Sequence, residues 1–213
     1  MMDTPLSPVE LRVLGALIEK EVTTPEYYPL SLNALVTACN QKSNRWPVVE
    51  FEDAEVLHAI EVLRHHGFAS EITGGSRVAK YRQRFTETLN MGRRETAILC
   101  VLMLRGQQTL GEIKGRTDRL YQFTDLEEVE LVLQKLMERP EGALAIKLAP
   151  APGMKEPRYA QLLGGPVDAG HEAAPAASAG HSRMGALEEE VQQLRKEVET
   201  LRARVEEVFV LLR

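Results

Sequence analysis

Hydrophobic residues recur in the first half of the chain at the spacing of amphipathic helices, and the same arrangement returns in the second half. Each copy then ends in two short extended runs separated by a turn or loop. The pattern therefore predicts the order helix, helix, helix and hairpin, twice in tandem. The matched segments are 10–17 with 95–102, 32–35 with 110–113, and 51–63 with 123–136.

Local signals set the expected ends of the elements in the first copy. Ser7, Pro8 and Glu10 form a helix start in which Ser7 caps and Glu10 closes a capping box. Pro25 and Pro29 predict an extended connection after this helix. Further elements are expected as helices over 31–38 and 53–66, then strands over 68–72 and 78–84 around the turn 73–76.

The second copy repeats these signals with shorter loops. Its first helix is expected from about Asn90 to Leu104, and capping-box patterns at Thr109 and Thr124 predict the next two helix starts. Its wing strands are expected over 143–149 and 158–163. The offset between copies falls from 85 to 78 to 72 residues, so the first copy carries extra residues in both loops between helices.

These elements predict an α+β fold, mainly α with small β-hairpin wings. The order of the elements in each copy is that of a winged helix, so we expect two tandem winged-helix domains, a flexible linker and a C-terminal coiled-coil helix. The linker follows from a Gly-, Ala-, Pro- and Ser-rich composition without periodicity. The expected boundaries are 1–87, 88–165, 166–183 and 184–213.

A heptad pattern marks the end of the chain. β-branched residues or leucine at a, with leucine predominating at d, favour a parallel two-stranded coil. Oppositely charged g–e′ pairs, Glu190 with Arg195 and Glu197 with Arg202, agree with it. We therefore expect a homodimer, with a single helix folding back on a winged-helix domain as the alternative. The a and d residues are Leu187, Val191, Leu194, Val198, Leu201, Val205, Val208 and Leu212.

Composition narrows the class of protein. The longest fully apolar run, Ala97–Leu104, is far shorter than the ~20 residues that a membrane span needs. The N-terminal residues have no basic region followed by an apolar one, so we expect no signal peptide. Cys39 and Cys100 are isolated on apolar helix faces, which favours reduced, buried thiols in a cytoplasmic protein.

Three long segments resemble the YceH-like family of bacterial proteins. They are 24–45, with TPEYYPLSLNAL and CNQKSNR, 105–112 (RGQQTLGE) and 152–159 (PGMKEPRY). The resemblance covers about residues 6–165 and implies two winged-helix domains without an established biochemical function. Trp46 departs from the family pattern, which has an acidic residue at this place, so a family role for this loop transfers less directly.

Acidic and basic residues are expected on different parts of the surface. The net charge is −5 and the pI about 5.7, which counts against nucleic acid as a partner. Carboxylates gather at the start of both third helices, where a winged helix would read the major groove. Positive charge lies in the loop before the third helix and on the first wing, and the candidate contact residues for DNA or a partner are Lys42, Asn44, Arg45, Trp46, Arg77, Lys80, Arg82 and Arg84.

The sequence contains no catalytic constellation, phosphate-binding loop or dinucleotide motif. His58 and His65 are two helical turns apart, ~10 Å, which is too far for one metal ion. We therefore expect no enzyme, no metal and no cofactor. The leading hypothesis is a dimeric DNA-binding regulator that acts through the loop and wing. The alternative is a protein-interaction adaptor that uses the acidic third helices without touching DNA.

Overall fold

The first helix begins where the capping signal predicts it. In the computed structural model, which describes residues 5–72, 78–150 and 156–167, helix α1 (Pro8–Thr23) has Ser7 as its N-cap. Ser7 Oγ accepts from the Glu10 amide at 3.3 Å, and the Glu10 carboxylate accepts from the Ser7 amide at 3.0 Å. The predicted coiled coil 184–213 and residues 168–183 of the predicted linker lie outside the described residues.

The first half continues with helices and a three-stranded antiparallel sheet in the order β1-β3-β2. The connection after α1 is a 3₁₀ helix and a short strand, where the prolines had predicted extended chain throughout. The elements are η1 (Pro25–Tyr27), β1 (Leu30–Ser31), α2 (Leu32–Cys39), α3 (Asp53–His65), β2 (Ala69–Ile72), β3 (Lys80–Gln83) and α4 (Phe85–Thr88).

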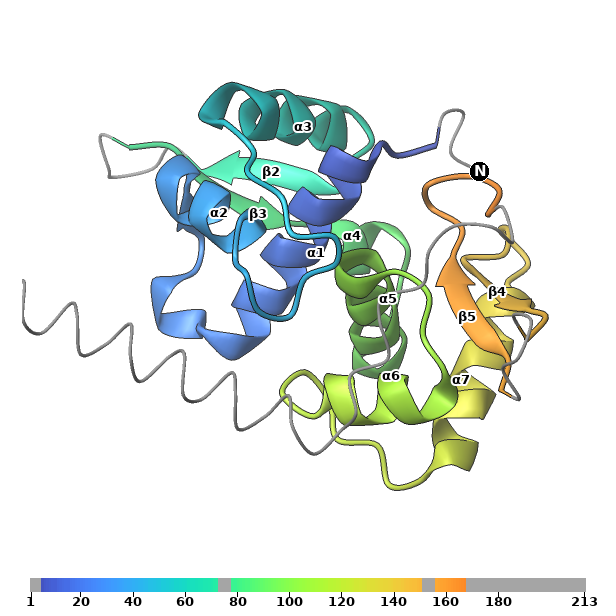
Figure 1. Ribbon diagram of the computed structural model, residues 1–213. Coiled ribbons are helices and arrows are strands. Elements are labelled where there is room, and N and C mark those ends of the chain that lie inside the picture. The colour runs from blue at the N-terminus through green and yellow to red at the C-terminus, as the bar shows by residue number, and fades with distance from the viewer. Residues whose placement is uncertain (1–4, 73–77, 151–155, 168–213) are drawn as a thin grey trace, which may run out of the picture. The chain divides into compact units, whose positions relative to one another are not determined.

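The second half repeats three helices and a hairpin (Figure 1). Thr109 caps α6 in a capping box, as predicted. The third helix begins one residue later than predicted, because the Asp125 carboxylate accepts from the Glu128 amide at 2.8 Å. The elements are α5 (Arg93–Arg105), α6 (Leu110–Thr117), α7 (Leu126–Met137), β4 (Ala145–Leu148) and β5 (Arg158–Gln161).

The internal repeat extends to the register of strand pairing. In the first half Leu30 pairs with Tyr81, and in the second an isolated bridge pairs Gln108 with Tyr159. Each residue of the second pair lies 78 positions after its counterpart in the first pair. Strands β2 and β4 likewise place a buried alanine opposite a glutamine. The fold is therefore α+β, as predicted, with all four hairpin strands shorter than the sequence suggested.

One hydrophobic core runs through both halves. Helix α1 packs along α5, and their facing leucines, among them Leu14, Leu17 and Leu102, are fully buried or nearly so. Burial of one such side chain stabilises the fold by roughly 1.5–3 kcal/mol. All the described residues belong to one compact unit, and the boundary at 87/88 stays a prediction.

Candidate functional site

The long loop between α2 and α3 is closed at its base by one asparagine. Asn40 Nδ2 donates to the carbonyl oxygen of Phe51, and the Phe51 amide donates to Asn40 Oδ1, both at 2.8 Å. This pair of bonds joins the C-cap residue of α2 to a residue just before the start of α3. Residues 41–50 therefore form a loop whose two ends are held together by Asn40.

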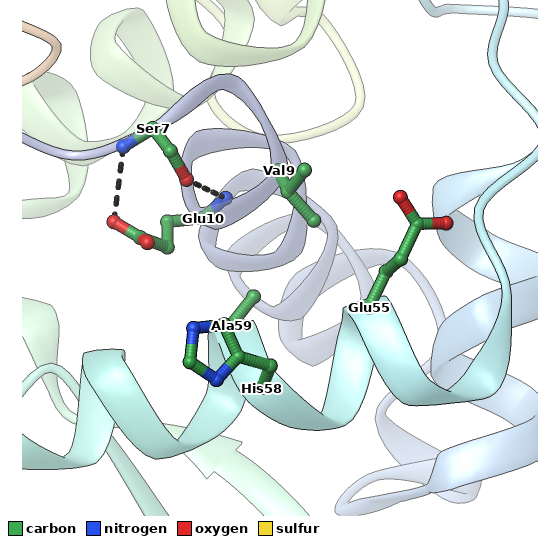
Figure 2. Close-up of a pocket in the computed structure, with 6 residues that line it drawn as sticks. All are labelled: Ser7, Val9, Glu10, Glu55, His58 and Ala59. Atoms are coloured by element: carbon green, nitrogen blue, oxygen red, sulfur yellow. Dashed lines mark hydrogen bonds between the residues drawn. The ribbon is translucent and has the colours of Figure 1, made fainter.

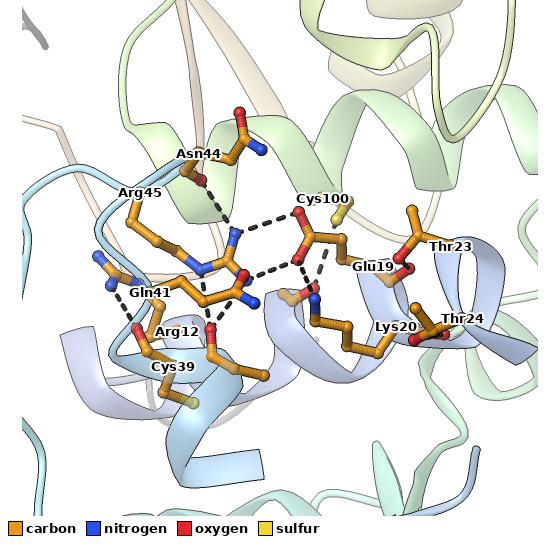
Figure 3. Close-up of polar contacts among 12 residues, drawn as sticks. Arg12, Glu19, Lys20, Thr23, Thr24, Cys39, Gln41, Asn44, Arg45 and Cys100 are labelled. Atoms are coloured by element: carbon orange, nitrogen blue, oxygen red, sulfur yellow. Dashed lines mark hydrogen bonds and ion pairs between the residues drawn. The ribbon is translucent and has the colours of Figure 1, made fainter. Parts of the chain in front are cut away.

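Arg45 lies inside this loop and not on its surface (Figure 3). Its Nη1 and Nη2 donate to the two carboxylate oxygens of Glu19 at 3.1 and 2.6 Å, and its Nε donates to the Ala38 carbonyl at 3.1 Å. The side chain of Arg45 is fully buried. A guanidinium held in this way is a positioning group for the loop and does not reach a partner.

Arg12 holds the other side of the same loop. It extends from α1 and donates to the carbonyl oxygens of Cys39 at 2.9 Å and of Pro47 at 2.6 Å. Burial, together with the positive charge of Arg45, lowers the pKa of Arg12 to about 10. Two buried arginines thus shape the loop from within, so its conformation is fixed by α1.

Of the other three candidate residues in this loop, one is exposed to solvent and two contact the second half. Lys42 is exposed and has no ion pair within the described part of the chain. Asn44 has a φ of 59° and accepts a hydrogen bond from Arg105 of α5. Trp46 is half-buried, and its backbone amide donates to the carbonyl oxygen of Leu104 at 2.8 Å. Asn44 and Trp46 therefore bind the two halves together.

Strand β3, which belongs to the hairpin predicted as the first wing, alternates as predicted, with Tyr81 and Gln83 buried. On its other face, the nitrogens of Arg82 and Arg84 lie 3.9 and 3.1 Å from the same Glu87 carboxylate. Arg82 also donates to Ser70 Oγ at 3.1 Å. Two of the expected cations are thus partly neutralised, Lys80 has no ion pair within residues 5–72, 78–150 and 156–167, and Arg77 lies outside them.

The exposed surface of α3 and its approach is acidic. Five carboxylates lie there, and no ion pair joins any of them to another side chain in the described ranges. At the other end of the helix, Arg64 is paired with Glu71 at 2.8 Å. This surface therefore carries negative charge that no cationic side chain of the described residues pairs, although Glu52 and Glu55 accept from backbone amides in a capping box. The five residues are Glu50, Glu52, Asp53, Glu55 and Glu61.

A small pocket lies between the start of α1 and this acidic face (Figure 2). Its volume is about 200 Å³, below the roughly 300–1,000 Å³ of small-molecule sites. No local sequence pattern predicts this pocket, because its two walls are about 45 positions apart in the chain. The lining residues are Ser7, Val9, Glu10, Glu55, His58 and Ala59.

Within the described ranges, no group of three or more His, Cys, Asp or Glu side chains is arranged to hold a metal ion. Both thiols are buried, and burial raises the pKa of each. A described helix long and apolar enough to cross a membrane is also not found.

Known proteins match this chain over nearly its full length. A UPF0502 protein of Solibacter usitatus is 54% identical over 209 residues, which cover 96% of this chain and 100% of the relative. UPF0502 proteins of Vibrio atlanticus and Citrifermentans bemidjiense are 47% and 50% identical, over 98% and 92% of this chain and 100% and 90% of their own lengths. The resemblance to an uncharacterised bacterial family is thereby confirmed.

A family model with the description "Protein of unknown function, DUF480" matches residues 6–154. This range contains both copies of the repeat up to the loop between β4 and β5, and with it the Arg45 loop and the acidic face of α3. On this match and on the identities above, the chain belongs to the DUF480 family.

Proposed function

We propose that this chain is a non-enzymatic, tandem winged-helix protein that docks a basic protein partner on the acidic face of α3. The repeated order of three helices and an antiparallel hairpin supports the winged-helix assignment. In such a domain the third helix is the element that normally enters the DNA major groove. Here that element offers a surface of the opposite charge to the one that DNA requires.

The observation that carries the proposal is the set of five exposed carboxylates on α3 and its approach, residues 50–61. Helix N-termini favour acidic residues, which accounts for Asp53 and Glu55 in the first turn. It does not account for Glu50 before the helix or for Glu61 two turns further on. Together these groups repel phosphates and attract lysine or arginine side chains.

The pocket beside this face supports a protein as the partner. Glu10 and Glu55 flank it, and the half-buried Val9 supplies an apolar surface. An arginine or lysine places its aliphatic stem on such a surface while its charged end meets carboxylates. Leu57, 37% exposed, adds apolar area on the same helix. Arginine inserted into a pocket is a common energetic centre of protein interfaces.

DNA binding remains the second candidate, because Lys42 and Lys80 are positive charges without a carboxylate partner within the described residues. The burial of Arg45 and the sharing of Glu87 by Arg82 and Arg84 leave this surface less positively charged than the sequence indicated.

We further propose, from the heptads alone, that residues 184–213 form a homodimeric coiled coil, and from composition that the protein is cytoplasmic.

The proposal is tested by fluorescence anisotropy of the full-length protein with two probes, a labelled arginine-rich peptide and a labelled random-sequence DNA duplex. Asp53→Asn with Glu55→Gln removes two charges and keeps the capping box, since glutamine also closes it. We expect peptide affinity to fall about fivefold, from ~0.5 kcal/mol for each lost charge contact. The matched control is Glu26→Gln with Asp118→Asn, two exposed carboxylates elsewhere.

Binding to DNA would respond in the opposite direction to the same substitutions. If the duplex binds at about 50 mM salt, weakens steeply by about 200 mM, and binds more tightly to the α3 variant, the protein is a DNA-binding one and the proposal fails. Equal loss of peptide affinity in the α3 variant and the control would also contradict it, because the effect would then come from net charge alone.

A further inference from the structure

A second charged cluster lies where the two halves meet, away from the face of α3. It combines residues of α1, of the loop after α2, of the end of α5, of α6 and of the start of β5. Within it the positive side chains Lys20, Arg45, Arg105, Arg116 and Arg158 face only two carboxylates, Glu19 and Glu112.

Both carboxylates already have cationic partners. Glu19 receives two hydrogen bonds from Arg45, and Lys20 Nζ lies 4.0 Å from it. Glu112 receives Arg158 Nη1 at 3.0 Å and Arg116 Nη2 at 3.4 Å, and its Oε2 also accepts from the Thr109 amide at 3.0 Å. Both acids are therefore already paired with cations other than Arg105.

Arg105 has no carboxylate of its own within the described part of the chain. Its guanidinium donates to the side-chain oxygen of Asn44, the residue whose carbonyl also accepts from Arg45 at 3.0 Å. Arg116 similarly donates to the side-chain oxygen of Gln108, whose Nε2 donates to the Arg105 carbonyl at 3.0 Å. For Arg105, a neutral amide therefore stands where a partly buried guanidinium normally meets an anion, whereas Arg116 shares the Glu112 carboxylate with Arg158.

The charge surplus acts on Arg105 directly. Burial and then the positive charge of Arg116 lower the pKa of Arg105 to about 10. Like charges are held close at this junction although each would be stabilised by a negative group between them. Arg105 and Arg116 both belong to the second half, and Asn44, which accepts from Arg105, belongs to the first.

We infer that Arg105 and Arg116 form a binding site for a phosphate-type oxyanion at the junction of the two halves. A guanidinium presents two parallel N–H groups that match a tetrahedral oxyanion, and two guanidinium groups match its double charge. The bound ion replaces the amide oxygens of Asn44 and Gln108 as acceptors. This site is separate from the proposed docking face, and a phosphate-bearing ligand bound there would stabilise the folded protein.

The test is thermal unfolding of the full-length protein in sodium phosphate against sodium chloride at equal ionic strength. We expect a saturable rise in Tm of about 3–6 °C at ten times the Kd. Arg105→Gln with Arg116→Gln abolishes the rise, and Arg105→Lys retains part of it. The control Arg93→Gln, on the exposed start of the same helix, leaves the rise unchanged.

Because the double variant itself lowers Tm, binding is also measured by equilibrium dialysis of radiolabelled phosphate well below its Tm. A rise that does not saturate, or undiminished phosphate binding by the double variant while it remains folded, overturns the inference. Competition then identifies the source of the phosphate group. Displacement by a nucleoside monophosphate indicates a small ligand, displacement only by duplex DNA indicates a nucleic-acid backbone, and either result supports the site.

Discussion

Cys100 of α5 donates its thiol hydrogen to the carbonyl oxygen of Gly15 in α1, across 3.4 Å. The two helices approach closely here because Gly15 has no side chain. A Cβ at position 15 would lie 2.8 Å from Cδ2 of Leu104 and 2.9 Å from its Cγ. Leu104 is only 3% exposed, so it has no open space into which to move.

We expect Gly15→Ala to destabilise the protein although it improves helix propensity. Overpacking a buried contact costs about 1–3 kcal/mol, whereas exchanging glycine for alanine in a helix gains at most ~1 kcal/mol. Gly115→Ala in α6 is the control, since a Cβ there meets nothing within 4 Å. Urea unfolding should show a loss for Gly15→Ala and a gain for Gly115→Ala; gains in both would refute the close contact.

Replacing Arg45 with methionine should destabilise the fold strongly, by about 3–5 kcal/mol, because it leaves the Glu19 carboxylate mostly buried without its partner. Arg84→Gln, which removes a surface pair with Glu87, should cost less than about 0.5 kcal/mol. Chemical denaturation of both variants gives the comparison. A loss below ~1 kcal/mol for Arg45→Met would mean that the side chain is solvated and available to a partner.

Because the Cys39 thiol is buried, we expect the free energy of unfolding to fall as the pH rises above 9. Burial raises its pKa from 9.0 to about 12. The folded state therefore keeps this proton while the unfolded state loses it, so the contribution is complete below pH 9 and falls as pH rises toward 12. Between pH 8 and 11, the difference in unfolding free energy between wild type and Cys39→Ala should shrink by ~1.4 kcal/mol per pH unit above 9. A constant difference would contradict a buried, protonated thiol.

Trp46 should report the unfolding of the junction, since it is the single tryptophan and its amide bonds to Leu104. The core is continuous between the halves, so we expect them to unfold in one transition. Trp46 fluorescence and pulsed labelling of the Cys100 thiol, in a Cys39→Ala background, should give the same urea midpoint. An earlier fluorescence transition would show that the halves separate before they unfold.

Local signals made the helices predictable. Ser7 and Thr109 act as caps through contacts with residues three positions away, and the alternation along β3 follows from its own sequence. The same locality explains the misses. Strand β1 has two residues, which is too few to carry a periodic pattern, and its two partners in β3 lie about 50 positions later.

The candidate site was harder to predict, because its geometry depends on distant residues. Arg45 stands among polar residues in a loop, where a sequence reader expects a solvated charge. Its burial depends on Glu19, 26 positions earlier, and on the Ala38 carbonyl. The acidic surface of α3, by contrast, was predictable from the sequence, because exposed charges on a helix do not depend on contacts with distant residues.

Gly15 and Cys100 are also equivalent positions of the repeat, 85 residues apart. The first helices of the two copies therefore meet at the same position of the repeat, so a change at Gly15 acts on both copies at once. Because the buried residues of both helices belong to one continuous core, neither half can lose its first helix without exposing the first helix of the other.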